Sequence, residues 1–191
     1  RLAAEPQVVT FSGERSIGQH GGNLRTLIGR SKDVRYLVVW GYARLMGYDH
    51  NFEMHADILK EYKVEEGRIF TFTLRKGHKW SNGDAFTSED FRYWWEDVAN
   101  NKSISPSGPP VAMLADGKLP MFEVLDEVTV RYTWDTPNPF FLSRLAGASP
   151  LFVYRPSDYL KKFHAKYSDE TALNKMAKEE GQRNWAALHN R

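Results

Sequence analysis

The chain has 191 residues, of which 41% are hydrophobic and 14% aromatic, so it can bury one substantial core or two small ones, and intrinsic disorder is disfavoured. Its 26 basic and 24 acidic side chains give a net charge of +2 without a long block of either sign, which argues against a tail that binds polyanions. The absence of cysteine excludes a disulfide framework, a thiol nucleophile and a cysteine-based zinc site, and it is also common in exported proteins.

No segment of the sequence is typical of a membrane span. The strongest apolar run, Tyr36 to Trp40, is far shorter than the roughly 18 residues that a spanning helix needs. The chain opens on Arg1 rather than Met, so we expect that a leader has been removed or that the chain has been trimmed. Residues 185–188 have the pattern of an amphipathic turn that needs a partner, so we do not expect Arg191 to be the natural end.

The first third of the chain gives weak signals of regular structure. Residues 1–23 are rich in turn-forming glycine, with one short apolar alternation at 8–11 that predicts a single strand. Apolar positions in 34–46 fall near helical spacing, which predicts a helix, although 38–40 fits a strand almost as well.

The middle of the chain carries the clearest pattern. Residues 68–75 alternate strictly between apolar and polar side chains, which predicts a strand that ends at Gly77. An Asn82-Gly83 turn follows, and Thr87 with Asp90 three residues later predicts a capping box at a helix start. That helix is expected to bury one aromatic face, formed by Phe91, Trp94, Trp95 and Val98.

Later elements mix helices and strands without a repeat. Residues 101–120 are rich in Ser, Pro and Gly, which predicts a long loop of functional or mobile character. We expect a second alternating strand at 128–134, helices at 140–145, 157–167 and between 168 and 181, and a short apolar strand at 151–154. Because strands and helices do not alternate regularly, the pattern favours an α+β fold over a doubly wound sheet.

Catalytic and metal-binding patterns are weak. His50 and His55 are five residues apart and would not share a helix face, so a polar loop explains them and Glu53 better than a metal site. No GxSxG elbow is present, and the glycines at 18, 21 and 22 fit turns better than a phosphate-binding loop. Asp84, Glu89 and Asp90 fit the turn and the helix start rather than an acid–base pair. We therefore predict no catalytic residue, no metal and no cofactor.

The aromatic residues could form a stacking surface for bases or sugars. Periodicity places Trp94, Trp95, Tyr132 and Trp134 on buried faces, so core packing is the better explanation for them. Trp40 and Tyr42 lie near glycines, and the pattern assigns them less clearly to a buried face. A nucleic-acid-binding role remains an alternative that a binding assay with single-stranded nucleic acid would test.

Residues 67–97, GRIFTFTLRKGHKWSNGDAFTSEDFRYWWED, resemble the signature of the family 5 solute-binding proteins of ABC importers. In that family a strand ending Phe-x-Leu-Arg-x-Gly leads through an aromatic residue and an Asn/Asp-Gly turn to a helix that opens Thr-x-x-Asp. Each part of the signature has a counterpart in this chain, at Phe72, Leu74, Arg75, Gly77, Trp80, Asn82, Gly83, Thr87, Asp90 and Phe91. The physical interpretation of the same block is a packing unit, so its residues are expected to support the fold.

Weaker similarities extend in family order on both sides of this block. They lie at 21–25, 45–49, 58–62 and 128–139, so that the resemblance covers about residues 20–155. It implies an α+β fold of the periplasmic-binding-protein type, class II and cluster C. Residues 1–35 would be the N-terminal segment of lobe I and 36–191 the small α+β subdomain attached to it, with the second lobe absent and the fold incomplete.

The resemblance implies a binding protein rather than an enzyme. It would capture a solute outside the cytoplasmic membrane, in the periplasm or tethered to the membrane, and deliver it to ABC permease subunits. The leading ligand is an oligopeptide, and a sugar, an opine or a metal chelate is the alternative. A hydrolase whose catalytic residues lie outside this chain is the rival from another class. No cofactor and no nucleic acid are expected, and the protein is expected to be a monomer.

Two regions are implied as ligand contacts. The first comprises Tyr36, Leu37, Val38 and Trp40, ahead of a Leu-x-x-Tyr-Asp step where relatives line the cleft. The second comprises Ser105, Ser107 and Gly108, in the loop where peptide binders often carry Ser-Pro-Tyr. This chain has Ser-Pro-Ser-Gly-Pro-Pro there, without the tyrosine, which puts peptide stacking at that point in question. The alternative is that both regions only support the fold.

Overall fold

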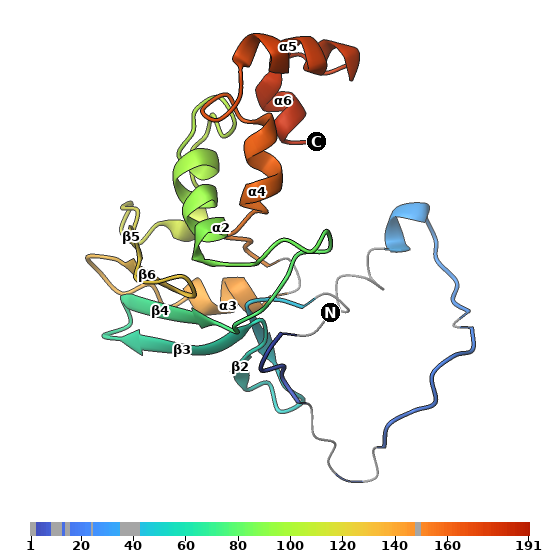
Figure 1. Ribbon diagram of the computed structural model, residues 1–191. Helices are drawn as coiled ribbons and strands as arrows, with labels where there is room; N and C mark the ends of the chain where they lie inside the picture. The colour runs from blue at the N-terminus through green and yellow to red at the C-terminus, as the bar shows by residue number, and fades with distance from the viewer. Residues whose placement is uncertain (1–2, 9–12, 14–15, 24, 35–42, 148–149) are drawn as a thin grey trace.

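The computed structural model describes residues 3–8, 13, 16–23, 25–34, 43–147 and 150–191. The described part has an antiparallel four-stranded sheet in the order β3-β4-β6-β5 and a separate two-stranded hairpin, β1-β2. Helices α2, α4, α5 and α6 stack on one side of the sheet, whereas the described residues between 13 and 34 extend away from this body (Figure 1). This is the α+β content that the sequence predicts.

Element bounds are as follows. The strands are β1 Met46–Tyr48, β2 Met54–Ala56, β3 Leu59–Glu65, β4 Ile69–Leu74, β5 Met121–Val124 and β6 Thr129–Thr133. The α-helices are α2 Ser88–Arg92, α3 Phe141–Ala146, α4 Ser157–Leu160, α5 Glu170–Glu179 and α6 Trp185–His189. Short 3-10 turns lie at Ser31–Val34, Val111–Met113 and Lys161–Phe163, and α2 continues into a π-helical segment, Tyr93–Ala99.

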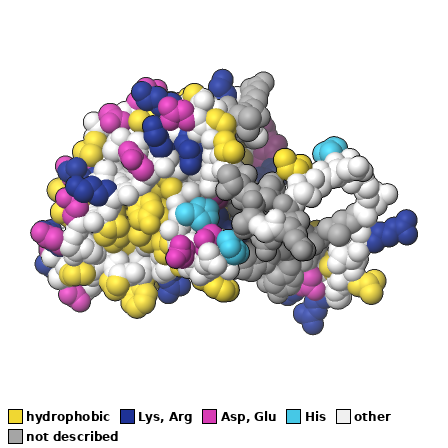
Figure 2. Space-filling view, turned by 90° about the horizontal axis from the view of Figure 1, so that it is seen from below, with side chains coloured by type: hydrophobic (Ala, Val, Ile, Leu, Met, Phe, Trp, Pro, Cys, Tyr) yellow, Lys and Arg dark blue, Asp and Glu magenta, His cyan; other side chains and the backbone are white. Residues whose placement is uncertain are grey.

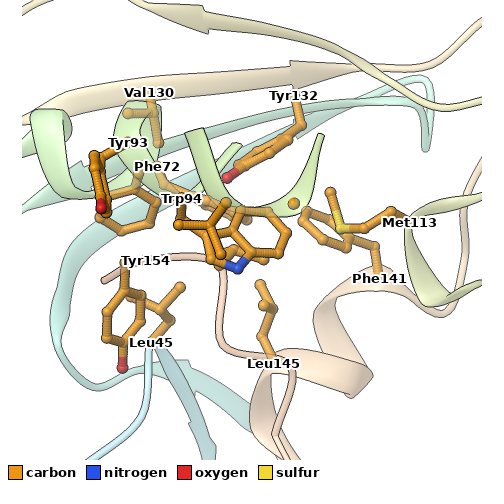
Figure 3. Close-up of a cluster of buried hydrophobic side chains, with 14 of the residues drawn as sticks. Leu45, Phe72, Tyr93, Trp94, Met113, Val130, Tyr132, Phe141, Leu145 and Tyr154 are labelled. Atoms are coloured by element: carbon orange, nitrogen blue, oxygen red, sulfur yellow. The ribbon is translucent and has the colours of Figure 1, made fainter. Parts of the chain in front are cut away.

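The core forms between the inner face of the sheet and the helices. Alternation puts Phe70, Phe72 and Leu74 of β4 on this face, each at most 3% exposed, beside Val130 and Tyr132 of β6. Figure 3 shows how α3 and the π-helical segment close over them. Phe141 of α3 lies at the centre, with its ring centroid 4.8 Å from that of Trp134 and 5.2 Å from that of Phe70. The predicted burial of Trp94, Tyr132 and Trp134 is confirmed, and Trp95 is half-buried.

Several predicted elements need correction. The helix expected at 34–46 is wrong at its end, because Met46 begins β1 and pairs with Ala56; residues 35–42 lie outside the described residues. The strand expected at 151–154 is also wrong. These residues form no strand, and the Leu151 amide donates to the Arg144 carbonyl of α3 at 2.8 Å. Most of the strand expected at 8–11 lies outside the described residues.

The helix expected at 157–167 is interrupted. It consists of α4 and the 3-10 turn Lys161–Phe163, after which the imidazole Nδ1 of the C-cap residue His164 accepts the Lys166 amide at 3.0 Å. The strands β3 and β5 lie at the two edges of the sheet and carry largely exposed or half-buried side chains, so the sequence pattern did not predict them.

Positive and negative side chains are interspersed on the face shown in Figure 2, without a large field of one sign. Within the described ranges, every helix is too short or too polar to cross a bilayer.

Candidate ligand-binding region

The block 67–97 folds as one unit. Strand β4 ends at Leu74, the chain reverses between Trp80 and Asp84, and α2 begins after the N-cap Thr87. In the reversal, the Gly83 amide donates to the Trp80 carbonyl at 3.0 Å, and Gly83 alone of the Asn-Gly pair has a positive φ, 98°. The predicted capping box is present, with the Glu89 amide donating to Thr87 Oγ1 and the Thr87 amide donating to Asp90 Oδ2 at 3.0 Å.

Asp90 joins this unit to a distant segment. Its Oδ2 also accepts from Trp80 Nε1 at 3.1 Å, and its Oδ1 accepts from the Ser157 amide at 2.8 Å. The side chain is 1% exposed, and this burial raises the pKa of Asp90 although the donors oppose the rise. Asp90, the third residue of α2, therefore also fixes the start of α4, which is a structural role, as the sequence predicts.

Gly77 is required by the N-terminal segment. Its φ is 76°, and a Cβ there would lie 3.2 Å from the Ala4 amide nitrogen, which donates to the Lys76 carbonyl at 2.8 Å. The same segment is held by Glu5, whose carboxylate pairs with Lys60 at 2.9 Å. The glycine thus allows the N-terminal segment to pack on the turn after β4.

Replacement of Gly77 by alanine is expected to cost about 1–3 kcal/mol of unfolding free energy through left-handed backbone strain, and also to release the N-terminal segment. Gly117→Ala is the matched control, since its φ is 75° and nothing lies within 4 Å of an added Cβ. Urea unfolding should therefore show a larger loss for Gly77→Ala than for Gly117→Ala. Faster proteolysis before residue 8 should accompany only the Gly77 variant, and equal effects of both variants would contradict the close-packing explanation.

An ion-pair network around the buried carboxylate of Asp97 joins α2 and the π-helical segment to residues 161–167. Asp97 is 3% exposed and accepts from Lys166 Nζ at 2.6 Å, Tyr167 Oη at 2.7 Å and Arg92 at 3.0 Å. Burial acts to raise the pKa of Asp97, but these hydrogen bonds and the charge of Arg92 outweigh it and lower the pKa. Glu89 extends the network to Lys161 at 2.8 Å. All its members have partners, so the network ties the helices together rather than offering a free charge.

The two predicted contact regions differ in what the structure reveals. Tyr36, Leu37, Val38 and Trp40 lie outside the described residues. Ser105, Ser107 and Gly108 lie together in the loop after the π-helical segment. The described residues do not show how Ser105, Ser107 and Gly108 lie relative to the first region.

The loop at 101–108 is held by its backbone. Asn101 Oδ1 accepts the amides of Ser103 and Ile104 at 2.9 and 3.3 Å, and the Gly108 amide donates to the Ser105 carbonyl at 2.9 Å. Ser105 is half-buried and Ser107 is exposed, and neither hydroxyl hydrogen bonds within the described part of the chain. A shaped loop with two unused hydroxyl groups can donate to, and accept from, a polar solute.

The C-terminal helix positions this loop. Asn190 Nδ2 donates to the Ile104 carbonyl at 3.2 Å, and the preceding residue, His189, has its Nε2 2.7 Å from Tyr93 Oη. His189 is 6% exposed and its Nδ1 is buried without a partner among the described residues. Burial, together with the nearby His164 and Arg155, lowers the pKa of His189 to about 4.

Acid is therefore expected to destabilise the chain between pH 6.5 and pH 4. In this window the unfolded state binds a proton at His189 that the folded state does not bind, so the contribution is complete above pH 6.5 and is lost as pH falls. We expect a loss of about 1–3 kcal/mol, measured by urea unfolding across this range. His189→Phe should make the free energy of unfolding less dependent on pH in this range, whereas the exposed His20→Gln should leave this pH dependence unchanged. An unchanged pH dependence in His189→Phe would contradict the assignment.

A small aromatic pocket was not predicted from the sequence. It has a volume of about 150 Å³ and is lined by Ile58, His78, Lys79, Trp80, Phe86 and Tyr154. Its rings come from the turn, from the residues before α2 and from the segment before α4, so only the tertiary structure brings them together. The Phe86 and Tyr154 centroids are 5.1 Å apart, which is core-like packing with one open side.

Among the described side chains, His, Asp and Glu nowhere gather into a set of three that could hold a metal ion. His55 instead contacts the Ala56 carbonyl through Nδ1 at 2.9 Å, and Asp49 accepts the turn amides of Asn51 and Glu53, each at 2.8 Å.

The antiparallel four-stranded sheet with helices on one side is an α+β architecture of the periplasmic-binding-protein type. Residues 53–185 match the family model of the bacterial extracellular solute-binding proteins, family 5, and the chain belongs to this family. The α+β fold of this type and the family resemblance, both expected from the sequence, are confirmed.

The known proteins that this chain matches are much longer than the chain itself. It superposes on the solved oligopeptide-binding protein OppA with a TM-score of 0.75 at 29% identity, over 92% of this chain and 27% of that one. The periplasmic binding protein MelB of Agrobacterium fabrum C58, solved in complex with stachyose, gives a TM-score of 0.53 at 29% identity over 66% of this chain and 20% of that one. The periplasmic alpha-galactoside-binding protein of Rhizobium meliloti (strain 1021) is 34% identical over 108 residues, 56% of this chain and 15% of that protein. The chain thus spans 15% to 27% of the length of these relatives.

Proposed function

We propose that this chain is part of the solute-binding component of an ABC importer, which captures a solute in the periplasm and delivers it to membrane permease subunits. The superposition on OppA over 92% of the chain is the observation that carries the proposal. Binding without turnover and a monomeric state are parts of the proposal, as is the absence of a nucleic-acid partner. The names of the periplasmic relatives support the location.

In this proposal residues 1–35 belong to the first lobe and 36–191 form the small α+β subdomain attached to it. The second lobe would come from a part of the protein outside this chain. Closure of two lobes around the solute would exclude water and report occupancy to the permease. The size of OppA, of which the chain covers 27%, supports this assignment of the two lobes.

An oligopeptide is the leading ligand. Tyr36, Leu37, Val38 and Trp40 are proposed to line one side of the cleft, and Ser105, Ser107 and Gly108 to contact the solute from the loop. A peptide would be held mainly through its main chain, as an added strand is, while hydrated pockets accept varied side chains. The free hydroxyls of Ser105 and Ser107 suit such polar contacts.

An α-galactoside is the second candidate ligand. The identity of 34% to the alpha-galactoside-binding protein favours it, as does the absence of a tyrosine in the Ser105 to Pro110 loop. Both ligands would use the same cleft, so the choice between them is a matter of specificity rather than of mechanism.

Thermal-shift screening of the full-length natural protein that contains this chain would test the proposal. Peptides of several lengths should raise the melting temperature in a saturable way. Ser105→Ala with Ser107→Ala should weaken the shift, whereas Ser103→Ala in the same loop should not. A shift by stachyose alone would replace the peptide by the galactoside, and chemical conversion of the ligand without a transporter would refute a purely binding role.

A further inference from the structure

A hollow of about 340 Å³ lies between the 3-10 turn Val111–Met113 and helix α3. Its walls are held by the core on both sides. Trp134 Nε1 donates to the Met113 carbonyl at 2.8 Å, and Phe141 and Leu145 anchor α3 with at most 1% exposure. The hollow is therefore preformed, and its volume is at the lower end of the range for small-molecule sites. It is lined by Val111, Ala112, Leu114, Asn138, Phe140 and Arg144.

Asn138 lines the hollow with a side chain that the fold does not use. Its backbone is fully engaged, because its amide donates to the Gly67 carbonyl at 2.8 Å and its carbonyl accepts from the Phe141 amide at 3.3 Å. The side chain is 5% exposed, yet Nδ2 has no hydrogen-bond partner in the described part of the chain. A buried polar group without a partner calls for an explanation, and a bound acceptor is one.

Arg144 supplies a free charge at the same place. It is exposed, and it forms no ion pair with any described residue. No Asp or Glu side chain lines the hollow. Its polar groups are the guanidinium of Arg144 and the side-chain amide of Asn138, which can turn about χ2 to present its N–H₂. Donors of this kind match a carboxylate, which a guanidinium can bind through two parallel hydrogen bonds.

The remaining lining residues are apolar and unusually exposed. Phe140 is 70% and Val111 is 80% exposed, and Leu114 is 37% exposed. They stand beside the donors rather than inside the core, so a ligand with an apolar body could cover them.

We propose that this hollow binds a small carboxylate carried on an apolar body about the size of one apolar amino acid. Arg144 and Asn138 hold the carboxylate, and Val111, Leu114 and Phe140 receive the apolar body. Ser105, Ser107 and Gly108 do not line the hollow, so the site is separate from the loop proposed for the transported solute and does not rest on that proposal.

An NMR titration of the ¹⁵N-labelled full-length natural protein that contains this chain with N-acetyl-leucine tests this site. A ligand this small is expected to bind with a Kd on the order of millimolar. Saturable shifts should map to residues 111–114 and 138–144. N-acetyl-leucinamide has the same body without the charge and should bind about tenfold more weakly or worse, because a charge-assisted pair is lost.

Variants separate binding from folding. Asn138→Leu keeps the backbone bonds and a similar volume, so its spectrum should show a folded chain that binds N-acetyl-leucine about tenfold more weakly. Arg144→Ala should weaken binding to a similar degree, while Arg144→Lys should restore part of it. The exposed Arg183→Ala serves as the control and should leave the affinity unchanged. Equal binding of the amide probe, unchanged affinity in both pocket variants, or the absence of shifts at these residues would each overturn the proposal.

Discussion

Replacement of Asp90 by alanine is expected to lower the free energy of unfolding by about 2–4 kcal/mol at neutral pH. The carboxylate accepts from the amides of Thr87 and Ser157 and from Trp80 Nε1, at distances of 2.8 to 3.1 Å. Alanine leaves these three donors without an acceptor, and the Ser157 amide lies in a fully buried bond. An unpaired buried donor loses its hydrogen bond and regains no water, which is why the effect exceeds that of a lost helix cap alone.

Urea unfolding followed by tryptophan fluorescence measures this effect. Thr87→Ala should cost only about 1 kcal/mol, since it removes the cap and leaves Asp90 in place. Asp158→Ala is the matched control, because Asp158 is exposed in the first turn of α4, next to Ser157, and should change stability by less than about 0.5 kcal/mol. If Asp90→Ala and Thr87→Ala cost the same, Asp90 acts only as a capping residue and its link to α4 is energetically irrelevant.

The two roles of Asp90 show what sequence could and could not predict. The capping box is local, because Thr87 and Asp90 are three residues apart, and so its prediction is confirmed. The bond to Ser157 spans 67 residues and leaves no periodic trace in the sequence. The same holds for Asp97, whose partners Lys166 and Tyr167 lie 69 and 70 residues away and make a buried charge acceptable.

Strand prediction succeeded where one face is buried. Strand β4 alternates between buried and half-buried side chains along its whole length, and β6 does the same. Strand β3 is an edge strand with a register irregularity between Leu59 and Glu61. This irregularity interrupts the alternation of side chains, so the sequence pattern does not predict the strand. At 151–154 a strand was predicted where none exists, since a short apolar run can be buried without pairing with another strand.

The aromatic helix after Thr87 was predicted with an α-helical face, but its second half is π-helical. This segment buries Tyr93 and Asp97 together with Trp94 and Val98, whereas Trp95, which the predicted face included, is only half-buried. Of the candidate site, the loop at 105–108 has the polar groups that its role requires, while its use by a ligand stays a proposal. The hollow beside Asn138 and Arg144 was not predicted because its lining residues come from two segments that are distant in the sequence.

Phe141→Ala is expected to be the most damaging single substitution in the core, at about 3–5 kcal/mol. Phe141 is fully buried, and its ring lies within 6 Å of the rings of Trp134, Phe70, Tyr132 and Phe72, which belong to both central strands and their flank. Truncation leaves a cavity that α3 cannot close, because the Val111–Met113 turn already packs against the helix's other neighbours.

The neighbouring Phe140 provides the control for this substitution. Phe140 is 70% exposed on the same turn of chain, so Phe140→Ala should change the free energy of unfolding by less than about 0.5 kcal/mol. Urea unfolding of the two variants should thus differ by several kcal/mol although the sequence change is the same. Because Phe140 lines the hollow while Phe141 supports it, Phe140→Ala should also weaken N-acetyl-leucine binding in a chain of unchanged stability. A stable Phe141→Ala variant would show that α3 can be repacked, and the rigid wall assigned to the hollow would then be lost with it.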